Sequence, residues 1–329
     1  MLIRLLSFLG FIAIAGPVVA ACSGTDLRNT LSEAEQARLS QELDGMPFAE
    51  GNHWRATRNG KIVHLIGTMH LADPRLDGPA GRLRDVVETA DLLLLEMTGE
   101  DEAEMQANMM SDPDFLLMSD TTLPEILSEA QWKQMSDALA ARGLPPFVAA
   151  RFQPWYVSML LAIPPCVGLD DLGGGGMDAQ LEAFAETADV PREALEDVET
   201  IFAAFTDQPR DMQIDMMLSA LVDPQISEDL FETLLAGYFD EATAESWAMS
   251  AILAERYSPI DPNTGAEIFA IIEQQLLTDR NKAWIPVIED ASNTHDMIVA
   301  AFGAAHLPGE FGVLALLEAE GFELERLPF

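Results

Sequence analysis

The chain has 329 residues, 49% of them apolar, which allows one large domain or two modest ones with a substantial core and excludes wholesale disorder. Its 18 basic residues against 55 acidic ones give a formal net charge of −37, and lysine occurs only at positions 61, 133 and 282. Because phosphate groups attract proteins through Lys and Arg, this charge argues against binding to nucleic acid or to an anionic membrane surface.

The first residues have the pattern of an export signal. Arg4 is the lone early charge, residues 5–15 are apolar, and Gly16-Pro17 breaks the run before the small residues 18–21. This is the pattern of a secretory signal peptide, and the apolar run is too short for a membrane span. We therefore predict that residues 1–21 are a signal peptide and that residues 22–329 form one domain, exported to the periplasm.

The two cysteines, Cys22 and Cys166, leave two alternatives open. Val19-Ala20-Ala21-Cys22 matches a lipoprotein processing site, and a lipid on Cys22 would anchor the protein to a membrane. Alternatively, cleavage falls just before Cys22, which then pairs with Cys166. We expect the disulfide, because an even number of cysteines in an exported chain favours pairing.

An early hairpin is predicted from the spacing of apolar residues and turn residues. Residues 54–57 and 62–66 alternate or run apolar, and Asn59-Gly60 between them is a strong signal for a tight turn. The second strand ends in Gly67-Thr68-Met69-His70.

A helix and a buried strand are expected next. Residues 79–90 have a helical pattern, and the unbroken apolar run 92–95 directly before Glu96 fits a buried parallel strand. This order predicts a right-handed parallel pair of strands. His70 and Glu96 would then lie at the same, carboxyl-terminal edge of the sheet.

From residue 100 to about residue 291 the signals are mostly helical, as over residues 124–141, 148–163 and 227–238. Strand signals return over residues 297–302 and 322–327, with a helix over residues 309–320 between them. We therefore predict an α/β fold: a small central sheet formed by the N- and C-terminal segments, with a long, mostly helical insertion.

The Gly-x-x-His pattern that ends the first buried strand occurs a second time near the end of the chain. Gly67-Thr68-Met69-His70 and Gly303-Ala304-Ala305-His306 each follow an apolar strand. Ligands of open α/β sheets bind outside the carboxyl ends of the strands, and imidazole is the commonest metal ligand in proteins. His70 and His306 are thus candidate site residues. The other histidines lack this context and are predicted to pack or to face solvent: His53, His64 and His295.

Glu96 is the natural third member of such a site. A carboxylate directly after four leucines lies at the edge of a dry core, where burial is costly unless the group is paired or ligates a metal. The alternative is an N-cap for a helix that begins near Thr98. Two histidines and one carboxylate suit a divalent metal such as Mn, Co or Zn. The sequence contains no H-E-x-x-H motif, which excludes a zincin.

The two G-x-x-H motifs, with an internal Glu and an Arg in the same order, resemble the TraB/GumN family from about Gly51 to Leu327. That family is related more distantly to the Tiki metalloproteases and to erythromycin esterase-like and ChaN-like proteins. The resemblance implies a metal-dependent hydrolase that acts on peptide or amide bonds of a peptide or small-molecule substrate. His70, Glu96 and His306 would be the metal ligands, with Glu96 alternatively the general base.

Arg280-Asn281 matches a family segment rich in Arg and Asn before a helix. Through this resemblance, Arg280 is a candidate to stabilise a developing oxyanion or to hold a substrate carboxylate. The alternative is an ion pair with Asp279 or Glu273.

Two weaker matches lie in the insertion. Gly176-Met177-Asp178 resembles a Gly-Leu-Asp motif of the family, and the alternative for Asp178 is to cap a helix. Leu195-Glu196 resembles its Gly-Leu-Glu motif, but Ala194 replaces the glycine, which leaves the role of Glu196 open.

The resemblance also admits a second class of function. TraB-like members limit the activity of peptide pheromones, and ChaN-like relatives bind haem. A non-catalytic module that binds a peptide, haem or a metal, or that inhibits a signal, therefore stands beside the hydrolase. Convergence of His70, Glu96 and His306 on one point would favour the hydrolase.

Overall fold

The structure is a computed structural model that describes residues 22–167 and 176–329. The signal peptide predicted for residues 1–21 lies outside the described residues. Six strands form one sheet in the order β4-β3-β5-β2-β1-β6. The strands are β1 (His53–Arg58), β2 (Lys61–Thr68), β3 (Leu92–Leu95), β4 (Arg192–Ala194), β5 (Met297–Gly303) and β6 (Glu323–Arg326).

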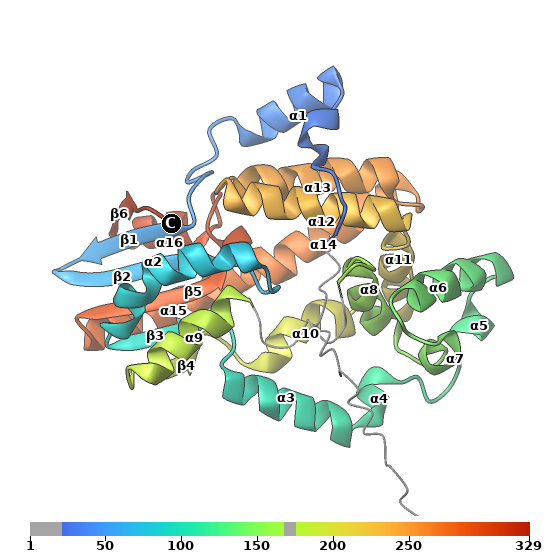
Figure 1. Ribbon diagram of the computed structural model, residues 1–329, viewed down its shortest axis with the longest axis horizontal. Coiled ribbons are helices and arrows are strands. Elements are labelled where there is room, and N and C mark those ends of the chain that lie inside the picture. The colour runs from blue at the N-terminus through green and yellow to red at the C-terminus, as the bar shows by residue number, and fades with distance from the viewer. Residues whose placement is uncertain (1–21, 168–175) are drawn as a thin grey trace, which may run out of the picture.

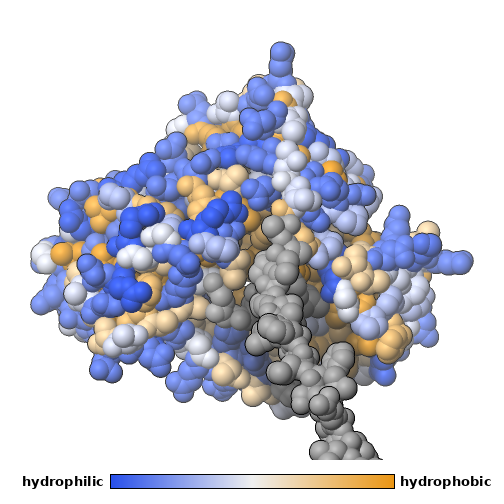
Figure 2. Space-filling view, in the orientation of Figure 1, coloured by the Kyte–Doolittle hydropathy of each residue, from blue (hydrophilic) through white to orange (hydrophobic). Residues whose placement is uncertain are grey.

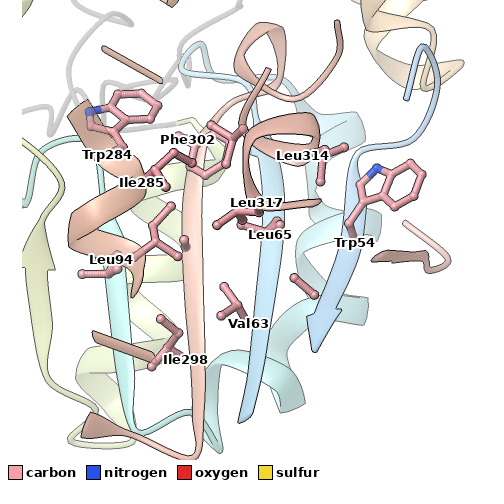
Figure 3. Close-up of a cluster of buried hydrophobic side chains, with 14 of the residues drawn as sticks. Trp54, Val63, Leu65, Leu94, Trp284, Ile285, Ile298, Phe302, Leu314 and Leu317 are labelled. Carbon is pink, nitrogen blue, oxygen red and sulfur yellow. The ribbon is translucent and has the colours of Figure 1, made fainter. Parts of the chain in front are cut away.

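Helices cover both faces of this sheet (Figure 1). One face packs against α2 (Asp77–Glu88), α9 (Met177–Thr187) and part of α12 (Pro224–Phe239). The other packs against α15 (Asp279–Thr294) and α16 (Val313–Ala319). On that second face, Trp284 and Leu314 lie over the buried strand residues Leu65 and Phe302 (Figure 3). The sheet is therefore fixed between two apolar cores, one on each of its faces.

The remaining helices lie mostly beyond the carboxyl ends of the parallel strands (Figure 1). They are α1 (Glu33–Leu43), α3 (Gly99–Ser111), α4 (Pro113–Leu116), α5 (Leu123–Ile126), α6 (Glu129–Ala141), α7 (Pro146–Ala149), α8 (Pro154–Ala162), α10 (Val198–Thr206), α11 (Arg210–Ser219), α13 (Thr243–Tyr257) and α14 (Pro262–Ile272). The face shown in Figure 2 is largely hydrophilic, as the excess of acidic residues requires.

The predicted α/β class with a helical insertion is confirmed, and so is the hairpin of β1 and β2. The predicted parallel pair of β2 and β3 is wrong in one respect, because β5 lies between them and pairs with both. Residues 298–302 are fully buried, and a strand buried on both faces belongs in the middle of a sheet. The insertion also supplies the edge strand β4.

Three predicted helices differ in extent because capping residues and proline or glycine set their ends. Residues 124–141 form two helices, since Ser128 caps the second through a capping box. Residues 148–163 divide at Pro154, the first residue of α8. The last helix begins only at Val313, after Gly309 adopts a positive φ of 92°.

Cys22 and Cys166 form a disulfide across a sequence separation of 144 residues, as expected. The bond ties the N-terminal segment to the insertion, and it uses the sulfur that lipidation of Cys22 would modify. Nearby, Thr25 N donates to Asp229 Oδ1 of α12 at 2.7 Å, which fixes the same segment. In the part of the chain that the structure describes, no helix has the length and apolarity needed to cross a membrane.

Candidate active site

The two G-x-x-H segments lie side by side because β2 and β5 pair in parallel, with Thr68 opposite Gly303. Both histidines therefore leave the sheet at the same edge. Gly67 permits this close approach, since a Cβ on it would lie 2.6 Å from Leu307 Cδ1 and 2.9 Å from Ala304 Cβ. A larger residue at Gly67 would push the segment before His306 away from β2.

His70 is oriented by Asp178 and stands at the open side of the site, with its side chain 58% exposed. Its Nδ1 lies 2.9 Å from Asp178 Oδ2, and Thr68 Oγ1 donates to Asp178 Oδ1 at 2.7 Å. Because an ionised carboxylate only accepts, Nδ1–H is the donor, and Nε2 lies 3.7 Å from Glu96 Oε1. The charge of Asp178 raises the pKa of His70 to about 10, although partial loss of solvation of the ring nitrogens opposes the rise.

His306 is the buried counterpart, with an exposure of 4%. Its Nδ1 lies 2.6 Å from Asn281 Oδ1, and Asn281 Nδ2 donates to the carbonyl of Phe311 at 2.9 Å. This second bond orients the amide, so His306 Nδ1–H donates and Nε2 keeps its lone pair. Nε2 lies 3.8 Å from Glu96 Oε1. Burial lowers the pKa of His306 to about 3, so the ring is neutral at physiological pH.

Glu96 lies between the two imidazoles. Its Oε1 accepts from the backbone N–H of Gly303 at 2.6 Å, and its Oε2 accepts from Arg280 Nη2 at 2.6 Å. The alternative role as an N-cap is wrong, because Thr98 caps α3. Burial by itself would raise the pKa of Glu96, but the charges of His70 and Arg280 and the hydrogen bond from Gly303 outweigh it and lower this pKa to about 2. The carboxylate is therefore ionised.

Gly303 forms the floor of a small space that these three side chains enclose. A Cβ on Gly303 would lie 3.2 Å from His70 Nε2, 3.3 Å from Glu96 Oε1 and 3.6 Å from His306 Cδ2. The glycine has φ −49° and ψ 132°, which any residue adopts. A glycine is therefore needed here for space rather than for backbone conformation.

Arg280 joins the site from the start of α15, just after a π-helical segment, Glu273–Thr278. Its Nε donates to Glu196 Oε1 at 2.8 Å, and Nη2 donates to Glu96 and also to Glu196. Nη1 donates to the carbonyl of Leu276 at 3.1 Å and lies 3.4 Å from His306 Nε2. Arg280 is 5% exposed, and all of its nitrogens have partners. These contacts, rather than an ion pair with a helix neighbour, fit a residue that positions Glu96.

A sequence model of the TraB/PrgY/gumN family matches residues 52–326, from the residue before β1 to the last residue of β6. The chain belongs to the TraB/PrgY/gumN family. The matched region contains both G-x-x-H motifs, Glu96 and Arg280, so the family match covers the whole site. No curated protein matches the chain closely enough to count as a relative.

Two site residues of this TraB/PrgY/gumN chain had no firm prediction. Asp178 does not cap α9, whose N-cap is Gly176, and binds His70 and Thr68 instead. The Gly-Met-Asp match to the family was the feature of the sequence that pointed to Asp178. The glycine of that match, Gly176, packs against the backbone carbonyl of His70 and so brings Asp178 close to it. Glu96 directly follows β3, and Glu196 lies two residues beyond the end of β4. Only a predicted strand at residues 192–194 would have placed Glu196 at this edge.

The side chains around Gly303 are of the kinds that bind metal ions, but their donor atoms lie slightly too far apart to bind one ion as placed. Two imidazole lone pairs and one carboxylate oxygen are a typical donor set for a divalent transition metal. Donor atoms bound to one ion at about 2.1 Å lie roughly 3.4 Å apart at a tetrahedral angle, somewhat less than the 3.7 and 3.8 Å found here. As placed, no three His, Cys, Asp or Glu side chains within residues 22–167 and 176–329 form a group able to hold a metal ion.

Proposed function

We propose that this TraB/PrgY/gumN protein is an exported, periplasmic, metal-dependent hydrolase of peptide or amide bonds. One observation carries the proposal: His70 Nε2, Glu96 Oε1 and the His306 ring enclose the space above Gly303. His70, Glu96 and His306 would hold a divalent ion such as Mn, Co or Zn. When bound, such an ion polarises a carbonyl or lowers the pKa of a bound water molecule.

The chain's own residues prepare these ligands. Asp178 and Asn281 each accept a hydrogen bond from the Nδ1–H of one histidine, which leaves Nε2 for the site. Partners of this kind set the orientation and basicity of metal-binding imidazoles. Since Asp178 keeps His70 protonated at neutral pH, binding a cation there requires His70 to release a proton.

The exposure of the two histidines gives the site a direction. The side chain of His70 is 58% exposed, whereas the side chain of His306 is 5% exposed and packs at a tilt against Trp284, with ring centroids 4.4 Å apart. A substrate therefore approaches from the His70 side. Arg280 donates to Glu96 Oε2 from the side opposite His70. Oε1 is then the oxygen of Glu96 that faces the substrate.

Replacing His70 with alanine is expected to lower cleavage of a peptide library in the presence of Mn, Co or Zn by at least about 100-fold, because one of three ligands is lost. His295→Ala is the matched control, since His295 lies just before β5, away from the site, and its ring hydrogen-bonds to Thr294 and to the carbonyl of Ala291. Mass spectrometry of the digests measures both variants. Equal cleavage by wild type and His70→Ala would refute the proposal.

A non-catalytic binding module remains the second candidate, and one observation favours it. Both oxygens of Glu96 already accept hydrogen bonds from the chain, from Gly303 and from Arg280, which limits its use as a general base. Peptide binding without cleavage under all three metals is the result that this candidate predicts.

A further inference from the structure

The ladder of hydrogen bonds between β1 and β2 ends just where the first G-x-x-H motif begins. The last paired residues are His53 and Ile66, and beyond them Gly67 N–H still donates to the carbonyl of Asn52 at 2.7 Å. In a regular antiparallel pair, Asn52 N–H would donate to the carbonyl of Gly67 in return. It donates instead to Glu241 Oε2 at 3.2 Å. The buried carbonyl of Gly67 therefore needs another donor.

The side chain of Tyr238 supplies this donor. Tyr238 lies buried on α12, and its hydroxyl donates to the carbonyl of Gly67 at 3.1 Å. Burial raises the pKa of Tyr238 far above its usual value, and the charges of Asp178 and Glu241 add to the rise, so the hydroxyl keeps its proton. The hydroxyl thus takes the place of the missing strand partner at the point where β2 leads into His70.

Asn52 fixes Tyr238 in this position. Its Nδ2 donates to the backbone carbonyl of Tyr238 at 2.9 Å, and its Oδ1 accepts from Thr243 Oγ1 at 3.1 Å. Gly67, Asn52 and Tyr238 are therefore linked in a closed ring of hydrogen bonds. Asn52 is fully buried, and a buried network whose members all have partners is rigid.

The same hydroxyl also contacts the helix that carries Asp178. It lies 3.4 Å from the sulfur of Met177, the first residue of α9. Met177 N–H donates to the carbonyl of Met69 at 2.8 Å, and Asp178 accepts from Thr68 and from His70. The segment that carries His70 and the start of α9 are thus bonded to each other, and this hydroxyl touches both.

We infer that the Tyr238 hydroxyl is a positioning group of the site: it fixes the end of β2 against α9, so that Asp178 orients His70 toward Glu96. Tyr238 acts through Gly67 and Met177 rather than on the reacting groups. Its role in a metal site rests on the proposed function, whereas its coupling of the two segments does not.

The test compares two substitutions on α12 that each remove one buried hydroxyl. Tyr238→Phe keeps the ring, which packs against Phe239 and Phe329. Thr233→Val is the matched control, because the Thr233 hydroxyl accepts from Leu27 N–H at 2.8 Å, on the side of α12 that faces the N-terminal segment. Each variant leaves a buried backbone group without its partner, so both should lose thermal stability. A change at the site in Tyr238→Phe alone is then not a general effect of lower stability.

Two measurements separate the inference from the proposed function. Hydrogen–deuterium exchange with mass spectrometry, on the metal-free protein, follows the backbone of residues 66–72 and 176–180. Titration with Co, followed by the visible absorption of the bound ion, gives the affinity and the geometry of a metal site that includes His70. We expect Tyr238→Phe to exchange about tenfold faster in both segments, to bind Co about tenfold more weakly and to change the absorption spectrum. Thr233→Val should match wild type in all three properties.

Co binding by wild type that Tyr238→Phe leaves unchanged would overturn the inference while the proposed metal site stands. Equal changes in both variants would also overturn it, because the hydroxyl would then have only a structural role. If wild type binds no Co, the proposed function fails and exchange alone decides. Faster exchange of the two segments in Tyr238→Phe alone would then uphold the coupling, and unchanged exchange would refute it.

Discussion

Replacing Gly303 with alanine is expected to weaken metal binding and peptide cleavage by at least about 100-fold while the fold is retained. The added methyl group would lie 3.2 Å from His70 Nε2 and 3.3 Å from Glu96 Oε1, within the space that the three ligands enclose. The backbone of Gly303 has dihedral angles that alanine adopts without strain, so the loss is specific to the site. Titration with Zn and the peptide-library assay measure the effect.

Gly81→Ala is the matched control, since a Cβ on Gly81 would meet nothing within 4 Å and the residue lies inside α2. It should keep full activity and slightly raise thermal stability, because alanine favours helix over glycine. If Gly303→Ala retains wild-type metal affinity and cleavage, the reacting groups do not meet above Gly303, and the proposed site is wrong.

Replacing Arg280 with alanine is expected to have the largest effect on stability, about 3–5 kcal/mol at pH 7. The substitution leaves two carboxylates whose side chains are 11% and 5% exposed: Glu96, which keeps only His70 as a counter-charge, and Glu196, which keeps none. Urea unfolding followed by circular dichroism gives the free energy. Arg210→Ala removes an exposed pair with Asp120 and should leave stability almost unchanged, because solvent screens exposed ion pairs. An equally small loss in both variants would contradict this account.

The stability lost in Arg280→Ala should also depend on pH. The folded-state pKa of Glu96, about 2, lies below the ordinary value of 4.5, so its stabilising contribution is present above pH 4.5 and is lost as pH falls toward 2. Without Arg280, Glu96 protonates more readily. The stability gap between wild type and Arg280→Ala should therefore narrow as pH is lowered from 4.5 to 2, and urea unfolding across that range checks it.

The sequence predicted those site residues whose place in the sheet is determined by a local pattern. An apolar run followed by glycine predicts a buried strand and the histidine beyond its end, so His70, Glu96 and His306 could be proposed together. Their meeting depends on the parallel register of β2, β5 and β3, which the apolar runs favour because buried strands pair with one another.

Residues whose roles depend on long-range packing were harder to predict. Asp178 reaches His70 across 108 positions, and Glu196 reaches Arg280 across 84. β4 has three residues, two of them charged and exposed, so its composition carries no strand signal and only pairing with β3 defines it. Likewise, the position of β5 between β2 and β3 follows from which strand is buried on both faces, a property of the assembled sheet.

Metal content of the purified protein, measured by elemental mass spectrometry after incubation with Mn, Co and Zn and removal of excess ions, tests the central claim most directly. The account predicts about one ion per chain in wild type and in His295→Ala, and near-complete loss in both His70→Ala and His306→Ala. Wild-type protein that holds no metal after incubation would contradict the metallohydrolase. His70 and His306 would then be hydrogen-bonding groups of a binding pocket.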